Sequence, residues 1–241
     1  DSKRLSKERI EEIHSKTTPH LTVKYRGLHR FNKILEKIGV RWSLAKDVSG
    51  ELQVEKMYFP VFYNNGDNRE LVGYRVRVAM KNGVPHKDFY VEGYCGIEGA
   101  ELIGKSYNSK IGETLIIVGG EVDLISTLGA MDDLMTRYKS RKINVISTIN
   151  GEKSLAETIR SDYDWIVAHN QIILAMDNDL AGQAATDEAL KVLPSEQVFL
   201  ANFGEYNDPN SFGYDIEALK TAIYWSVQPV DDFGYVGADE L

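Results

Sequence analysis

The sequence has a single cysteine and no long hydrophobic run, and each absence excludes a class of protein. Cys95 alone cannot form an internal disulfide or a multi-cysteine zinc site. The longest apolar runs, such as TLIIV and IILAM, are too short to span a bilayer. The first residues also lack the apolar stretch of a secretory signal. We therefore expect a soluble, cytoplasmic protein.

The chain also lacks the excess of positive charge that a general nucleic-acid binder needs, since its net charge is −8. The charge is unevenly distributed. Residues 1–40 carry ten Lys and Arg against five Asp and Glu, whereas residues 201–241 carry eight acids and one base, Lys220. Carboxylates that hold divalent ions would mask part of this acidity. Composition therefore excludes a histone-like binder and leaves a metal-dependent nucleic-acid enzyme open.

The second half of the chain has the pattern of an α/β domain. From about Thr114 onward, four short β-branched runs, TLIIVGG, INVISTI, QIILAMD and QVFLANF, are typical of strands buried on both faces. Helical patterns lie between and after them, at 122–140, 153–168 and 180–193. This alternation predicts a parallel sheet with helices packed on it.

The part before Thr114 has a different pattern. Residues 5–16 and 26–40 are expected to be helical, because their apolar residues recur on one helical face. Alternating runs that follow, joined at NNGDN and KNG, are typical of antiparallel hairpins. The strands are expected at 51–63, 70–80 and 86–94. This half therefore predicts a smaller α+β unit.

Acidic side chains follow three of the predicted strands. Asp177 and Asp179 come directly after IILAM, and Asp208 follows QVFLANF. Glu121 opens the helix after TLIIVGG. Parallel strands end at one edge of a sheet, and alternate residues point to one side, so the aspartate pair can share a hard cation such as Mg²⁺. Helix capping and turn chemistry explain each acid singly, but they do not require the pattern.

The order of these motifs resembles the Toprim domain shared by primases and topoisomerases, in which a glutamate-bearing loop precedes Asp-x-Asp-x-Ala-Gly. The segments LIIVGGEVDLIST, VISTINGEKSL, NQIILAMDNDLAGQAATDEALKVLP and YNDPNSF are similar to the primase half of phage-type primase–helicases, which include mitochondrial Twinkle. Upstream, YFPVFYNNGDNRELVGYRVRV, HKDFYVEG and ELIGKSYN are similar to the family's basic-hairpin subdomain. The resemblance covers about residues 25–230.

The resemblance implies an α/β Toprim fold, a parallel sheet flanked by helices, preceded by a smaller α+β basic-hairpin subdomain. We expect three parts along the chain: 1–110 as an N-terminal polymerase subdomain, 111–227 as a Toprim metal-binding domain, and 228–241 as a linker stub. The helicase half is expected outside this chain, and the strand-to-helix loop VGGEVD has no P-loop lysine.

The resemblance also implies roles for single residues. Asp177, Asp179 and Asp208 would bind the catalytic Mg²⁺ or Mn²⁺, with no zinc in this chain. Basic residues of the upstream hairpins would contact nucleotide phosphates or template, which maps onto Arg75, Arg77, Lys87 and Lys105. The alternative for each of the four is a solvated sheet face. Alternation of Arg75 and Arg77 on one strand face favours a shared ligand.

One position departs from the family pattern, which usually reads Glu-Gly-Glu in the first loop. Gly119 stands at the first glutamate, and only the second, Glu121, is kept. Moving a carboxylate two residues along a loop shifts it by several ångströms, since each residue spans ~3.3–3.6 Å. Glu121 is the remaining candidate for the acid that assists proton transfer or completes the metal shell. An inactivated or degenerate domain is the alternative.

These observations predict the catalytic core of a DNA primase, a DNA-directed RNA polymerase that makes short RNA primers by metal-dependent nucleotidyl transfer. The expected partners are a single-stranded DNA template, ribonucleoside triphosphates and a replicative helicase domain, fused or associated, and no membrane. A phage origin would place the protein in the host cytoplasm. One alternative, favoured by Gly119, is a catalytically impaired module that binds single-stranded DNA or a helicase. The other is a Toprim nuclease.

Overall fold

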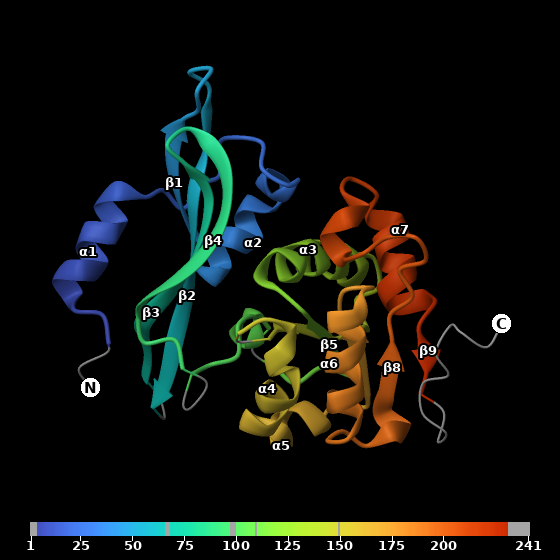
Figure 1. Cartoon of the computed structure of the whole chain (residues 1–241). Helices are drawn as coiled ribbons and strands as arrows, with labels where there is room; N and C mark the ends of the chain where they lie inside the picture. The colour runs from blue at the N-terminus through green and yellow to red at the C-terminus, as the bar shows by residue number, and fades with distance from the viewer. Residues whose placement is uncertain (1–3, 66–67, 97–99, 109, 149, 231–241) are drawn as a thin grey trace. The chain divides into compact units, whose positions relative to one another are not determined.

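The computed structural model describes residues 4–230 except 66–67, 97–99, 109 and 149. The chain divides into two compact units, residues 1–101 and residues 102–241 (Figure 1). No helix in the described ranges combines the length and the apolar character that a membrane crossing requires.

The first unit is built on a four-stranded antiparallel sheet of order β1-β2-β3-β4. A helix, a 3₁₀ turn and a second helix precede the sheet, and Figure 1 shows α1 and α2 on opposite sides of it. Strand β1, with Trp42 fully buried, was not predicted from the sequence. The elements are α1 (Lys7–Lys16), η1 (Leu28–Phe31), α2 (Asn32–Ile38), β1 (Arg41–Lys46), β2 (Leu52–Asn65), β3 (Asn68–Lys81) and β4 (Val84–Gly93).

The hairpin predicted at KNG is confirmed. Lys81 pairs with Val84, and the two residues between them, Asn82 and Gly83, have φ angles of 53° and 76°. Positive φ at both central residues matches the right-handed twist of the strands, which is why Asn-Gly is favoured there. The turn predicted at NNGDN includes residues 66–67, which lie outside the described residues.

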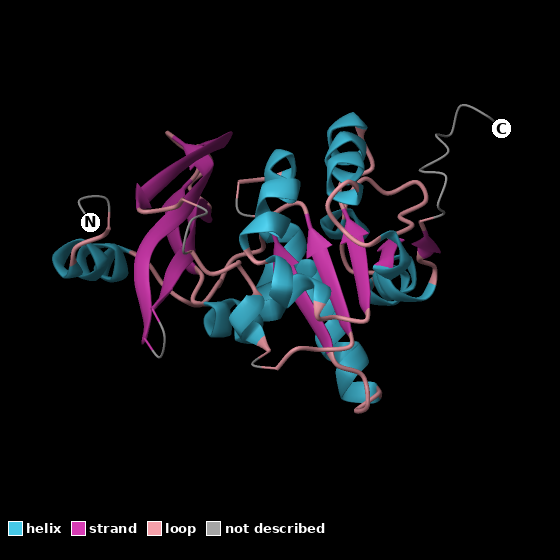
Figure 2. Ribbon diagram, turned by 90° about the horizontal axis from the view of Figure 1, so that it is seen from below, coloured by secondary structure: helices cyan, strands magenta, loops and turns pink. Residues whose placement is uncertain are grey.

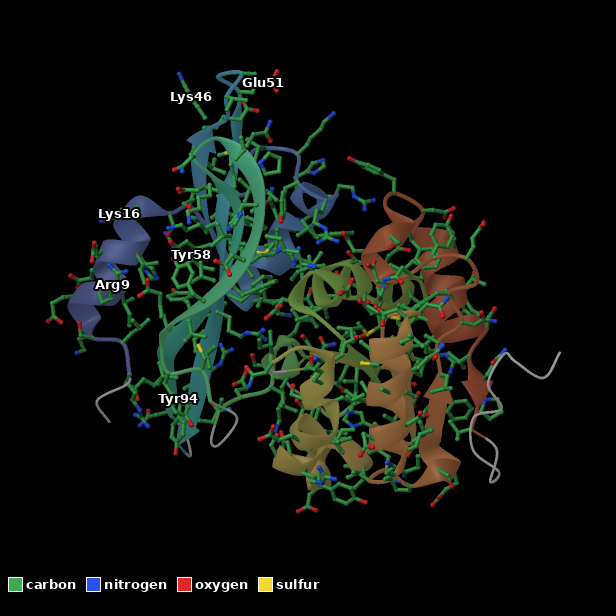
Figure 3. The ribbon with its side chains drawn as sticks, in the orientation of Figure 1. Arg9, Lys16, Lys46, Glu51, Tyr58 and Tyr94 are labelled. Atoms are coloured by element: carbon green, nitrogen blue, oxygen red, sulfur yellow. The ribbon has the colours of Figure 1, made fainter. Side chains whose placement is uncertain are left out.

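Helix α1 covers one face of the antiparallel sheet. Ile13 packs with Tyr58, Tyr74 and Val76 in one buried cluster. Figure 3 labels Tyr58 on the sheet, and Arg9 and Lys16 on α1. Because side chains alternate along a strand, the residues between these apolar ones on β3 point to the opposite face.

The second unit is built on a five-stranded sheet of order β6-β5-β7-β8-β9. All pairings are parallel except that of β9, a short strand at residues 228–229 that the sequence did not predict. Every residue of β5 and β6 is buried, which agrees with their continuous apolar runs. The strands are β5 (Thr114–Val118), β6 (Ile143–Ser147), β7 (Gln171–Ala175), β8 (Val198–Leu200) and β9 (Gln228–Pro229).

Helices cover both faces of this sheet (Figure 2). Helix α3 contacts α7 on one face, and α4 contacts α6 on the other. Short 3₁₀ and π-helical turns join these elements. The helical elements are η2 (Lys105–Tyr107), α3 (Glu121–Arg137), η3 (Glu152–Ser154), α4 (Leu155–Ser161), α5 (Tyr163–Val167), α6 (Leu180–Leu190), η4 (Ser195–Gln197), η5 (Pro209–Phe212), α7 (Ile216–Lys220) and η6 (Thr221–Trp225).

Four helix predictions were wrong in detail. The helix expected at 26–40 is η1 followed by α2, and the one expected at 122–140 ends at Arg137. The single helix expected at 153–168 is broken at Asp162, whose φ of −145° leaves the helical region. The Asp162 carboxylate there binds the Lys105 ammonium instead of continuing a solvated helix face. The helix expected at 180–193 ends at Leu190. The predicted α/β Toprim-type sheet and the preceding α+β unit are confirmed.

Candidate active site

The carboxyl ends of β5 and β6 are joined directly above the sheet. The Thr148 hydroxyl donates a hydrogen bond of 2.7 Å to the carbonyl oxygen of Gly119, and the Thr148 amide donates one of 3.1 Å to Val118. Thr148 is fully buried. These bonds hold the loop after β6 against the loop after β5.

The aspartate pair lies where β7 passes into α6. Asp179 is the N-cap of α6, and its Oδ1 accepts hydrogen bonds of 2.9 Å from the amides of Ala181 and Gly182. The capping alternative is therefore correct for one oxygen of Asp179. Asp177 precedes it by two residues in the same loop, directly beyond the buried end of β7.

Hydrogen bonds tie this loop to the segment that carries Asp208. The amide of Asn178 donates to the carbonyl of Asn207 at 2.6 Å, and the Asn178 side chain donates to Gly204 at 3.2 Å. Asp208 caps the 3₁₀ turn η5 and accepts from the amide and the hydroxyl of Ser211 at 2.6 and 2.7 Å. The two acidic loops are therefore neighbours.

A fourth carboxylate, that of Glu152, enters the same edge, and sequence reasoning missed it. Its Oε1 accepts a hydrogen bond of 2.6 Å from the amide of Asp177. Glu152 begins η3, immediately after Gly151, whose φ of 77° turns the chain sharply. The hydroxyl of Ser154 closes this turn with a bond of 2.8 Å to the Gly151 carbonyl.

The environment of Glu152 disfavours its ionised form. Partial burial raises the pKa of the Glu152 carboxyl above its ordinary value, and the hydrogen bond from the Asp177 amide opposes this. The charges of Asp179 and Asp208 raise the same pKa further. Glu152 therefore lies within electrostatic range of two predicted metal ligands.

The donor chemistry of this edge fits a hard divalent cation. Asp179 and Asp208 each use Oδ1 for the backbone, and within the described residues no hydrogen bond reaches Oδ2 of either one. Carboxylate oxygens are the ligands that Mg²⁺ and Mn²⁺ prefer. In the described part of the chain, no three His, Cys, Asp or Glu side chains already converge on one ion position.

Glu121, the acid predicted to compensate for Gly119, is the first residue of α3 and is only 7% exposed. Two turns of α3 bind the loop after Asp208: Asp123 accepts from the amide of Asn210 at 3.2 Å, and Ser126 accepts from its side chain at 3.0 Å. The start of α3 therefore helps to position the loop that carries Asp208.

A cavity of about 220 Å³ begins beside Asp177 and Asn178 and continues between β7, α6 and β8. Its lining mixes polar side chains, such as those of Gln183 and Asn202, with apolar ones such as Leu174. Pockets for drug-sized ligands usually measure ~300–1,000 Å³. This cavity is smaller than such a pocket.

Of the four predicted phosphate-binding residues, Lys105 lies in the second unit. Its ammonium binds the Asp162 carboxylate and lies 4.8 Å from the centre of the Trp165 ring. The other three, Arg75, Arg77 and Lys87, lie in the first unit.

Arg75 and Arg77 are half-buried on the face of β3 that points away from α1. Across the strand pair, Arg75 is opposite Val91 and Arg77 is opposite Phe89. The Arg77 guanidinium lies 5.2 Å from the centre of the Phe89 ring, which is 46% exposed. Lys87 is exposed on the same strand as Phe89. An exposed aromatic ring beside cationic side chains suits stacking on nucleic-acid bases. Phe89 was not among the residues predicted from the sequence.

Comparisons with known proteins find similar domains over this part of the chain. Residues 116–213 match the family described as Toprim-like. A DNA helicase/primase of Enterobacteria phage T3 is 28% identical over 132 residues, which are 54% of this chain and 22% of that protein. The chain therefore spans about a fifth of this relative.

Two solved structures of bacteriophage T7 proteins are also similar, each at 27% identity. The primase fragment of the primase–helicase superposes with a TM-score of 0.55, over 75% of this chain and 64% of that one. The second structure contains primase domains bound to an RNA/DNA hybrid and dTTP, together with the lagging-strand DNA polymerase. It superposes with a TM-score of 0.58, over 82% of this chain and 88% of that one. The resemblance to phage-type Toprim primases is confirmed, and it supports a primase function.

Proposed function

We propose that this chain is the catalytic core of a DNA primase, which joins ribonucleotides into short primers on single-stranded DNA. The observation that carries the proposal is the gathering of Asp177, Asp179 and Asp208 at one edge of a Toprim-like sheet. The similarity to phage primase domains, one of them bound to an RNA/DNA hybrid, supports the same reaction.

In the proposed reaction the three aspartates hold Mg²⁺ or Mn²⁺ through their oxygens. When bound, such an ion lowers the barrier to attack of a 3′-hydroxyl on an α-phosphate and stabilises charge on the leaving pyrophosphate. The backbone amides of α6 and η5 fix Asp179 and Asp208 through Oδ1, so each presents Oδ2 in a set direction. Glu121, buried at the start of α3, is proposed to assist proton transfer at this edge.

Residues 1–110 are proposed as a polymerase subdomain with basic hairpins, which would neutralise triphosphate or template phosphates. Arg75, Arg77 and Lys87 carry the charge for this, and Phe89 adds a ring on which a base can stack. Lys105 would bind phosphate only by leaving Asp162.

The remaining parts of the proposal concern the whole protein. A replicative helicase domain, fused or associated, is proposed to follow the residues after 227 in the phage-type arrangement, in the cytoplasm of an infected host. Residues 228–229 pair with β8, and residues 231–241 of the expected linker lie outside the described part of the chain.

Extension of a diribonucleotide tests the proposed activity. The chain is incubated with single-stranded DNA, labelled diribonucleotide, ribonucleoside triphosphates and Mg²⁺ or Mn²⁺. The unmodified chain should lengthen the diribonucleotide, and Asp177→Ala should reduce the rate by at least about a hundredfold, the scale of one lost electrostatic group in a catalytic site. No extension with either ion would contradict the proposal.

The two alternatives give different products in the same tube. A nuclease would shorten the DNA without nucleotides, and Asp177→Ala would stop that shortening. An impaired binding module would retard the DNA in a gel and leave the diribonucleotide unchanged. The hairpin residues that carry positive charge favour synthesis over hydrolysis.

The salt dependence of DNA binding tests the basic face. Arg77→Gln should weaken binding to single-stranded DNA and reduce the slope of log K against log salt by about 0.7, the value for one lost phosphate contact on a single strand. Fluorescence anisotropy at several salt concentrations measures this slope. Lys46→Gln is the matched control, because Lys46 lies at the exposed end of β1 (Figure 3). Equal slopes for both variants would exclude Arg77 from the contact.

A further inference from the structure

We propose that Glu152 supplies the carboxylate that the first loop lacks at Gly119, so that the acidic edge is completed from the loop after β6. This inference rests on the proposed metal-dependent function of the same edge.

The Glu152 side chain lies against Gly119. A Cβ atom built on Gly119 would lie 2.7 Å from Cγ and from Oε1 of Glu152, and 3.1 Å from its Cδ. Real Cβ atoms essentially never approach other heavy atoms within 3.0 Å. The Glu152 side chain therefore occupies the volume into which any side chain at position 119 would project. A side chain at position 119 would require the Glu152 side chain to move, and the absence of one at Gly119 leaves room for Glu152 where it lies.

Hydrogen bonds orient the Glu152 side chain and its loop. Oε1 of Glu152 accepts a hydrogen bond of 2.6 Å from the Asp177 amide nitrogen, so the carboxylate is held beside the first aspartate of the pair. A hydrogen bond of 2.7 Å from the Thr148 hydroxyl to the Gly119 carbonyl oxygen holds the two loops together. The turn at Gly151 and the 3₁₀ turn that follows then hold the Glu152 backbone in place. Several independent contacts thus aim this side chain at the same edge.

A purely structural Glu152 would have the same hydrogen bond, and one substitution separates the two roles. Glutamine retains a side-chain oxygen that can accept from the Asp177 amide, but it removes the charge. If the role of Glu152 is structural, Glu152→Gln leaves Mn²⁺ binding unchanged. If the carboxylate acts on the bound ion, the same substitution weakens Mn²⁺ binding.

Binding of Mn²⁺ is the first readout, measured by the loss of the free-ion signal in electron paramagnetic resonance. Glu152→Gln should weaken binding by about 10–100-fold, the range found when partners of a metal site are changed. Glu157→Gln on α4 is the matched control, since Glu157 is exposed and lies on the next helix. Urea unfolding should be unchanged in both variants.

The second readout is a swap between the two loops. Gly119→Glu alone should disturb the site, because its side chain meets that of Glu152. Glu152→Ala alone should lower diribonucleotide extension by at least about a hundredfold, as for removal of one acid–base or electrostatic group. The double variant Gly119→Glu/Glu152→Ala should recover at least tenfold of that loss, since the acid returns from the other loop.

The outcomes separate this inference from the proposed function. If the unmodified chain extends no primer but binds Mn²⁺, and Glu152→Gln weakens that binding, the inference stands and the primase proposal fails. If Glu152→Gln binds Mn²⁺ as the control does, the inference is overturned even where the chain is an active primase. Failure of the unmodified chain to bind Mn²⁺ would overturn both.

Discussion

Asp179→Asn is expected to lower diribonucleotide extension by about a thousandfold while leaving the stability of the chain almost unchanged. The Oδ1 atom of Asp179 caps α6, and its Oδ2 atom is proposed to bind the ion. Asparagine caps a helix about as well as aspartate, so the free energy of unfolding should change by less than ~0.5 kcal/mol. A metal ion contributes several kcal/mol of transition-state stabilisation, and about 4 kcal/mol corresponds to a thousandfold in rate.

A matched substitution at another helix start isolates the metal role. Asp215 caps α7 with a bond of 2.9 Å to the Ala218 amide, and it is exposed. Asp215→Asn should leave both extension and unfolding unchanged. Asp179→Ala should lose the rate and, in addition, about 1 kcal/mol of stability because the cap is removed. If Asp179→Asn retained full activity, Asp179 would be a cap and nothing more.

The elements that carry the site could be predicted because their signals are local. Strands β5 to β7 are short continuous apolar runs, and Asp177 and Asp179 follow one of them at once. Burial on both faces leaves little alternative to a parallel sheet, and a parallel sheet brings its carboxyl ends to one edge. The position of the acids was therefore implied by the same pattern that implied the fold.

Glu152 and the short strands could not be predicted because their signals are not local. Glu152 lies in a Gly-Glu-Lys-Ser segment whose composition is that of any exposed turn, and only the packing of two loops brings it over Gly119. Strand β9 has two residues, too few for any periodicity. The break at Asp162 depends on Lys105, which is 57 residues away. The only related signal in the sequence is the missing acid at Gly119.

Gly182→Ala is expected to destabilise the chain, although helix propensity alone predicts the opposite. Gly182 is the third residue of α6, where replacing glycine by alanine normally stabilises by about 1 kcal/mol. A Cβ atom there would lie 2.0 Å from the carbonyl oxygen of Asp177 and 2.9 Å from its carbonyl carbon. Both atoms belong to the backbone and cannot rotate away. The variant should therefore lose about 1–3 kcal/mol in the free energy of unfolding, as overpacked cores do.

The sign of this change, measured by urea denaturation, decides between the two effects. Ala184→Gly, on the exposed side of the same helix, should cost about 0.5–1 kcal/mol through propensity alone and thus calibrates α6. Displacement of the Asp177 backbone in Gly182→Ala should also break the hydrogen bond from the Asp177 amide to Glu152. Mn²⁺ binding should therefore weaken in that variant and not in Ala184→Gly. A gain in stability for Gly182→Ala would show that α6 does not start in close contact with Asp177. The coupling between the aspartate loop, Glu152 and the ion would then lose its structural basis.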